Sequence, residues 1–97
     1  LSAASRNLLL SWMTATQTGV RRIRAGLPKG TTVADKTGTS GTDDGVTAAT
    51  NDIAIVTLPN GRHAFVAIFV SDSKEEQVVR EGVIAKLART AWQCWTN

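Results

Sequence analysis

The stretch that decides the fold runs from Thr50 to Ser71 and reads TNDIAIVTLPNGRHAFVAIFVS. Its two ends, Thr50 to Leu58 and His63 to Ser71, are rich in β-branched and aromatic residues, which is typical of strands. The segment between them, Pro59-Asn60-Gly61-Arg62, contains an Asn-Gly pair, which tolerates the positive φ of a tight hairpin turn. The stretch therefore predicts an antiparallel hairpin at the centre of the fold.

Both strands of this hairpin carry apolar residues on two faces. The alternating sets are Ile53, Ile55 and Thr57 against Ala54, Val56 and Leu58, then Phe65, Ala67 and Phe69 against Val66, Ile68 and Val70. An antiparallel sheet with one wet face alternates apolar with polar residues, so we expect both faces of this sheet to be covered. The chain has too few helices for that, and we infer that elements outside these 97 residues complete the sheet and its cover.

The segments before the hairpin predict a helix, a short helix and a further strand. Ser2 is a suitable N-cap for a helix that continues to Thr14, and Gly19 is expected to cap the end of that helix. A second, short helix is expected over 20–25. A strand begins near Thr31 and leads through Lys36 to Thr39, and a loop over 40–45 follows it. The apolar stripe of the first helix is Leu8, Leu9, Trp12 and Met13.

The segment after the hairpin predicts a long C-terminal helix. Ser73 is expected to be its N-cap, with Glu75 and Glu76 in the first turn, where the helix dipole favours anions. Apolar residues recur at intervals of four, and a second row widens the stripe that we expect to face the core: Val79, Val83, Leu87, Ala91 and Trp95, then Ile84, Ala88 and Trp92. The order of elements predicts an α+β fold of α-β-α sandwich type, with three antiparallel strands from this chain flanked by helices.

Composition excludes several classes of function. The chain has 11 Lys and Arg against 8 Asp and Glu, and a net charge of +3 is too weak to indicate a nucleic-acid partner. The longest apolar run, Ala64 to Val70, is far below the roughly 20 residues of a membrane span. Cys94 is the single cysteine, so no internal disulfide forms and no Cys/His cluster predicts a metal site or a cofactor. The opening Leu1 is preceded by neither an initiator Met nor a secretory signal, so we expect an internal or C-terminal piece of a longer chain.

The run Lys36-Thr37-Gly38-Thr39-Ser40-Gly41 carries the chemistry. Thr37 and Thr39 lie two positions apart, so their hydroxyls point to the same face, and Gly38 between them lets a ligand approach the backbone. Lys36 is expected at the end of a buried strand, where its ammonium needs an anionic partner. One cation, two hydroxyls and a free backbone N–H predict a site for a carboxylate. An edge strand in this position also suits pairing with an extended amide ligand.

Lys36-Thr37-Gly38 resembles the third motif, K-T-G, of the serine β-lactamases and penicillin-binding proteins. Other segments extend the resemblance to class A β-lactamases over essentially the whole chain: Leu1-Ser2-Ala3-Ala4-Ser5 with Trp12-Met13, Arg24-Ala25-Gly26-Leu27-Pro28, Ala34-Asp35 and Thr50-Asn51-Asp52-Ile53. The run from Lys36 to Gly41, together with Ala48-Ala49-Thr50-Asn51-Asp52, is most similar to the extended-spectrum branch that includes the PER and VEB groups.

The resemblance implies roles along the K-T-G strand. Lys36 would have a catalytic role as well as a binding role: it would hold the carboxylate of a β-lactam electrostatically and bias the proton equilibria of the nucleophile. The Thr37 and Thr39 hydroxyls would donate hydrogen bonds to the carboxylate. Gly38 and Ser40 would complete this substrate-binding strand. The Thr39 N–H would be one of two oxyanion-hole donors, which stabilise the charge that develops on the lactam carbonyl.

The resemblance also implies roles for residues beside that strand. Arg22 matches the place where some members present an arginine to the substrate carboxylate, and the alternative is a solvated helix charge. Arg24 and Asp35 would form a structural salt bridge beneath the strand. Asn51 and Asp52 would give structural support.

The same resemblance implies an enzyme that acylates a serine with the lactam ring and then hydrolyses the acyl group, without a metal or cofactor. We expect this chain to supply none of the S-x-x-K, S-D-N and E-x-x-L-N segments, which would lie upstream, so the chain alone would be inert. Residues 1–28 would belong to or border an all-α subdomain, and 29–97 would form the strands and last helix of an α/β subdomain. The bacterial periplasm or secretion is the implied location. A D-alanyl-D-alanine peptidase and a non-hydrolytic β-lactam-sensing domain remain alternatives.

Overall fold

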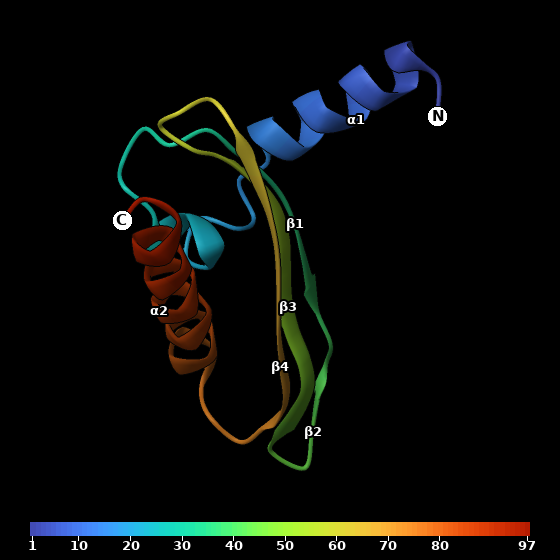
Figure 1. The fold of residues 1–97 in the computed structure, drawn as a ribbon. Coiled ribbons are helices and arrows are strands. Elements are labelled where there is room, and N and C mark those ends of the chain that lie inside the picture. Colours follow the sequence, from blue (N-terminus) through green and yellow to red (C-terminus); the bar gives the residue numbers. More distant parts are fainter.

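The computed structural model describes all 97 residues, and its sheet lies between two helical parts of unequal size. The elements in order are α1 (Ala3–Ala15), the 3-10 helix η1 (Ile23–Gly26), β1 (Val33–Thr39), β2 (Thr42–Asp43), β3 (Val46–Thr57), β4 (His63–Ser73) and α2 (Gln77–Trp95). Figure 1 shows α2 and η1 together on one side of the sheet, whereas α1 extends away on the other side. The predicted class, helices around an antiparallel sheet, is confirmed.

The sheet is built around β3, its longest strand. Both β1 and β2 pair with β3 along one side, and β4 pairs with it along the other. The predicted hairpin is present, with Gly61 at a φ of +83° in its turn. The loop after Thr39 contains one strand that the sequence analysis did not predict, the two-residue β2, which turns back through Asp44 and Gly45 at positive φ. The sheet therefore has four strands, of which three are long.

The N-terminal segment agrees with the prediction at its start and differs at its end. Ser2 caps α1 by accepting a hydrogen bond from the Ser5 N–H at 3.0 Å. The predicted cap at Gly19 is wrong, because α1 ends at Ala15 and Thr16 already has an extended backbone. Gly19 is instead buried against Asp35, where a Cβ would overlap the carboxylate. The expected short helix is a single 3-10 turn.

The C-terminal helix presents a different face to the core from the one predicted. Its N-cap is Glu76, and Ser73 ends β4 while its Oγ accepts a hydrogen bond from the Glu75 N–H at 3.1 Å. The row that the intervals of four predicted is largely exposed: Val79 (43%), Val83 (42%) and Leu87 (52%). The buried side chains are Arg80, Glu81, Ile84 and Ala88. The second row, with Ile84, Ala88 and Trp92, was therefore the correct part of the predicted stripe.

The core lies between the sheet and the α2–η1 layer. Its buried members are Ile23, Leu27, Val33, Ala54, Val56, Ile68, Ile84 and Ala88, with Trp92 and Trp95 packed against them. Ile23 and Leu27 thus share a core with the strands. The division of the chain into an all-α part over 1–28 and an α/β part over 29–97 stays a prediction. No helix combines the length and the apolar character that a bilayer span requires.

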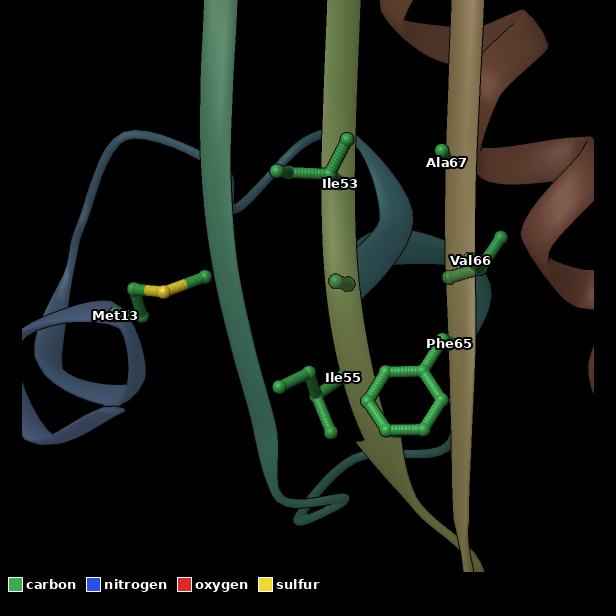
Figure 2. A pocket seen from close by; sticks show the side chains of 7 residues that line it. Met13, Ile53, Ile55, Phe65, Val66 and Ala67 are labelled. Carbon is green, nitrogen blue, oxygen red and sulfur yellow. The ribbon is translucent and has the colours of Figure 1, made fainter. Parts of the chain in front are cut away.

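The opposite face of the sheet is open in this chain. Phe65 and Phe69 are 76% and 67% exposed there. The side chains of Met13, Ile53, Ile55 and Phe65 stand around a shallow apolar hollow beside α1 (Figure 2). The stripe of α1 is exposed as well, with no buried residue in the helix and Trp12 at 64%. The covered face of the sheet thus agrees with the prediction that apolar faces are buried. Cover over the other face stays a prediction.

Candidate functional site

The outer edge of β1 presents backbone groups to solvent. Two hydrogen bonds at the ends of the β1–β3 ladder fix which groups face β3: Ser40 N–H to Ala49 O at 2.9 Å and Thr57 N–H to Thr32 O at 3.0 Å. Because backbone groups alternate in direction along an antiparallel strand, the even-numbered residues of β1 are the ones that bond to β3. The N–H and C=O groups of Thr37 and Thr39 therefore point away from β3, along an edge to which no strand of this chain pairs.

Lys36 and the two threonines approach this edge from opposite faces of the sheet. The Thr37 Oγ1 donates to Thr18 Oγ1 at 3.2 Å, and Thr39 Oγ1 accepts from Arg22 at 2.6 Å, both on the η1 side. Lys36 lies between them in sequence and so points to the other face, where its Nζ donates to Thr37 O at 2.7 Å. A ligand held by all three side chains must consequently lie along the edge of β1 rather than over one face.

Lys36 differs from its predicted setting in one respect. We expected a desolvated ammonium at the end of a buried strand, but Lys36 is exposed. The buried part of β1 is its first half, Val33 to Asp35, and the strand becomes accessible from Lys36 onward. Gly38 is also exposed, and a Cβ there would approach no atom closer than 3.9 Å. The K-T-G residues thus form the accessible half of the strand.

Arg22 is buried, with 3% of its surface exposed, and lies beneath the accessible half of β1. Its Nε donates to Glu81 Oε2 on α2 at 3.0 Å. One of its terminal nitrogens donates to Gly38 O and Asn51 O, and the other to Thr39 Oγ1. The alternative of a solvated helix charge is therefore wrong. Arg22 reaches the edge through the Thr39 hydroxyl, and direct contact with a substrate stays a prediction.

Arg24 and Asp35 form the expected ion pair. Arg24 Nε lies 2.8 Å from Asp35 Oδ1, and the Asp35 side chain is fully buried. A terminal nitrogen of Arg24 also donates to Val33 O at 2.8 Å and to Met13 O at 3.0 Å. The guanidinium thereby joins the end of α1 to the edge of β1, which supports the structural role that the sequence predicted.

Asn51 and Asp52 lie on β3 directly opposite Gly38 and Thr37. The Asn51 carbonyl accepts from Arg22 at 2.7 Å. Asp52 is fully buried, and its Oδ2 accepts from the Ile23 N–H at 3.1 Å. Burial, followed by the nearby Asp35 carboxyl, raises the pKa of Asp52 to about 7. Both residues thus support the K-T-G strand from the neighbouring strand.

The Ser40 hydroxyl is directed toward β3. Its Oγ accepts a hydrogen bond from the Ala49 N–H at 2.9 Å, in place of the backbone carbonyl that would accept it in a regular ladder. The side chain thereby closes the end of the β1–β3 pair, and contact of Ser40 with a substrate stays a prediction.

Two residues of the site were not predicted from the sequence: Glu81, which holds Arg22, and Thr18, which holds Thr37. A signal for Glu81 was available: Glu81 precedes Ile84 by three positions, which places its carboxylate on the buried stripe of the helix. A charged residue in such a stripe requires a buried partner of opposite charge. Thr18 lies in a turn and carries no such signal.

The expectation that no serine here has the S-x-x-K spacing is wrong, because Ser71-Asp72-Ser73-Lys74 has that spacing. Ser71 lies on β4 and pairs with Ala49 of β3. It is thus separated from the outer edge of β1 by the whole width of β3, roughly 10 Å at the usual strand spacing. Ser71 therefore lies outside the site that Lys36 and the threonines form.

Comparison with known proteins matches residues 1–95 to the model of the β-lactamase enzyme family. The chain belongs to that family. The extended-spectrum β-lactamase PER-1 of Pseudomonas aeruginosa is 53% identical over 93 residues, which cover 96% of this chain and 30% of PER-1. β-Lactamase VEB-1 of the same species is 43% identical over 97 residues, all of this chain and 32% of VEB-1.

Solved structures of β-lactamases have the same fold. The TLA-1 extended-spectrum β-lactamase superposes with a TM-score of 0.96 at 49% identity, over 100% of this chain and 36% of that one. A β-lactamase from Chitinophaga pinensis gives 0.94 at 51% identity, over 99% of this chain and 36% of that one. The predicted membership of class A is confirmed, and the chain spans about a third of the length of these relatives.

Proposed function

We propose that this β-lactamase family chain supplies the K-T-G strand of a serine enzyme that hydrolyses β-lactam antibiotics. The open edge of β1 carries the proposal, because it presents outward-directed backbone groups beside one ammonium and two hydroxyls. Lys36 attracts the substrate carboxylate, the Thr39 hydroxyl donates to it, and the Thr37 hydroxyl donates to it in place of Thr18 Oγ1. The Thr39 N–H donates to the lactam oxygen as negative charge develops there.

The reaction follows an acyl-enzyme route that needs residues beyond this chain. A serine Oγ attacks the lactam carbonyl carbon, the amide C–N bond breaks, and the ring nitrogen takes up a proton. Water then cleaves the resulting ester and releases the opened product. We assign the nucleophile, its base and the water-activating glutamate to S-x-x-K, S-D-N and E-x-x-L-N segments upstream in the same enzyme. We further propose that the enzyme acts in the bacterial periplasm or is secreted.

Steady-state hydrolysis of a chromogenic cephalosporin by the full-length protein tests this proposal. We expect Lys36→Ala to lower kcat/KM by roughly 100-fold or more, because it removes the charge that captures the carboxylate. Lys86→Ala is the matched control, since Lys86 is an exposed lysine on α2, and it should retain the original kcat/KM.

Four results would contradict the proposal or redirect it. Equal kcat/KM for the Lys36→Ala and Lys86→Ala variants would remove Lys36 from the site. A single burst of acylation without turnover would favour the β-lactam sensor, and cleavage of a D-Ala-D-Ala peptide at a higher rate than the cephalosporin would favour the peptidase. Hydrolysis by the 97 residues alone would refute the need for upstream groups.

A further inference from the structure

Arg80 of α2 is a buried cation that has no carboxylate partner. Only 6% of its surface is exposed. Neither of the two ion pairs in the chain includes Arg80. Its side chain donates one hydrogen bond, to Thr50 Oγ1 at 2.8 Å, and its Nε is buried without an acceptor. Such a guanidinium costs folding free energy, because a hydroxyl does not compensate the charge as a carboxylate would.

The place of Arg80 in its helix does not account for the charge either. Arg80 is the fourth residue of α2, which begins at Gln77. The helix dipole disfavours a cation near this end of a helix. The first turn of α2 also has no acidic residue that could offset the charge. Helix stability therefore gives no reason for an arginine at this position.

The three buried acids of the chain leave Arg80 with an excess positive charge. Glu81 and Asp35 already compensate the other two arginines of the site. Asp52 is the third buried acid. Burial, followed by the nearby Asp35 carboxyl, raises the pKa of Asp52 to about 7, so this group carries little negative charge below neutral pH. The positive charge of Arg80 is then balanced by no group of this chain.

The charge lies directly behind Thr39 of the K-T-G strand. Thr50 of β3 is opposite Thr39 in a pair without backbone hydrogen bonds, which brings the two Cβ atoms to about 5 Å from each other. Both hydroxyls lie on the face that packs against α2 and η1, because Thr50 accepts from Arg80 and Thr39 accepts from Arg22. The Arg80 guanidinium is thus on the order of 10 Å from a ligand at the Thr39 hydroxyl.

A buried charge at this distance is sufficient to change the binding of an anion. Two unit charges about 10 Å apart, at an effective dielectric constant of about 20, change a binding constant roughly tenfold. Salt screens a buried charge less than an exposed one. Arg22 contacts Thr39 directly, but Glu81 compensates its charge. The uncompensated cation behind this part of the strand is consequently Arg80.

We propose that Arg80 is a positioning residue for the substrate: its uncompensated charge, held against the Thr50 hydroxyl, draws a carboxylate to the Thr39 end of the K-T-G strand. Arg80 touches no substrate and acts through the positive potential at the edge of β1, in addition to Lys36. The role of Arg80 rests on the proposed function, because it concerns the carboxylate that the edge would bind.

Hydrolysis of a chromogenic cephalosporin with a single carboxylate, and of its methyl ester, by the full-length protein at about pH 6 tests this role. The ester has no negative charge, so the kcat/KM of the acid divided by that of the ester reports the attraction of the carboxylate. A loss of folded protein cancels in this acid-to-ester ratio. Arg80→Gln removes the charge, whereas its amide can still donate to Thr50 Oγ1.

We expect Arg80→Gln to lower the acid-to-ester ratio roughly three- to tenfold. The change should appear as a higher KM for the acid, with kcat within about twofold of the wild type, because the attraction acts on binding. Arg80→Lys keeps the charge and should keep the ratio within about twofold. Arg89→Gln is the matched control, since Arg89 is an exposed arginine of the same helix, and it should leave the ratio unchanged.

The outcomes separate this inference from the proposed function. Equal ratios for the wild type and Arg80→Gln would overturn the role of Arg80, while hydrolysis of the acid by both would leave the proposed function intact. A ratio as low in Arg80→Lys as in Arg80→Gln would also overturn the role, because charge would not be its cause. If Arg80→Gln does not fold, Arg80→Met removes the same charge and decides by the same criterion. A wild type that hydrolyses neither compound would refute the proposed function and the role of Arg80 with it.

Discussion

At the scale of single residues, Gly19 packs tightly against a side chain beneath the site. Its Cα packs against the buried Asp35 carboxylate, which the Arg24 guanidinium holds at 2.8 Å. Because the carboxylate is fully buried and bonded to Arg24, we expect Gly19→Ala to lower the free energy of unfolding by about 1–3 kcal/mol in urea titration. Gly41→Ala is the control, since nothing lies within 4 Å of a Cβ there. Equal losses from the two substitutions would contradict the packing argument.

The two ion pairs beneath the site differ in how far the sequence predicts them. Arg24 and Asp35 lie 11 positions apart and both belong to segments that resemble the family, so their pairing was expected. Arg22 and Glu81 lie 59 positions apart, and their contact depends on where α2 packs across the sheet. Local sequence patterns give no information about contacts between residues so far apart. Arg22 was therefore expected to face either solvent or the substrate.

At the scale of elements, α2 is linked to β1 through Arg22. Replacing the Glu81 carboxylate by an amide keeps an acceptor for Arg22 Nε but removes the compensating charge from a buried guanidinium. We therefore expect Glu81→Gln to destabilise the fold by about 1–3 kcal/mol in urea titration. Glu75→Gln, at an exposed position before the helix, should change stability by less than about 0.5 kcal/mol. No difference between the two variants would show that the Arg22–Glu81 pair contributes little.

The same helix illustrates why its buried face was only partly predictable. Intervals of four in a 3.6-residue helix drift around the axis, so the row from Val79 to Trp95 does not stay on one face. Arg80 and Glu81 occupy the buried face in place of apolar residues, which hid the true stripe. Arg80 and Glu81 have polar partners there, in Thr50 and Arg22, so a search for apolar residues alone places the wrong side of α2 against the core.

At the scale of the whole molecule, the sheet has one covered face and one open face. The sequence of the two hairpin strands predicted apolar side chains on both faces of the sheet. The structure places α2 and η1 on only one of these faces (Figure 1). The chain spans 30% of PER-1, so the remaining length of such an enzyme is sufficient to cover the open face. The strand pairing was predictable because it depends on local turn chemistry, whereas the identity of the cover lies outside the 97 residues.

Phe65 provides the test of this cover, because it is the most exposed aromatic side chain of the open face at 76%. In the full-length protein we expect Phe65→Thr to lower the free energy of unfolding by about 3 kcal/mol or more, since a covered phenylalanine loses its packing. In the isolated 97 residues the same substitution should instead reduce binding of a hydrophobic dye, because it removes apolar surface from an uncovered face. Arg62→Thr in the exposed hairpin turn is the control and should leave both measurements unchanged. A neutral effect of Phe65→Thr on the full-length protein would mean that this face stays open to solvent, and the inferred cover would have to be abandoned.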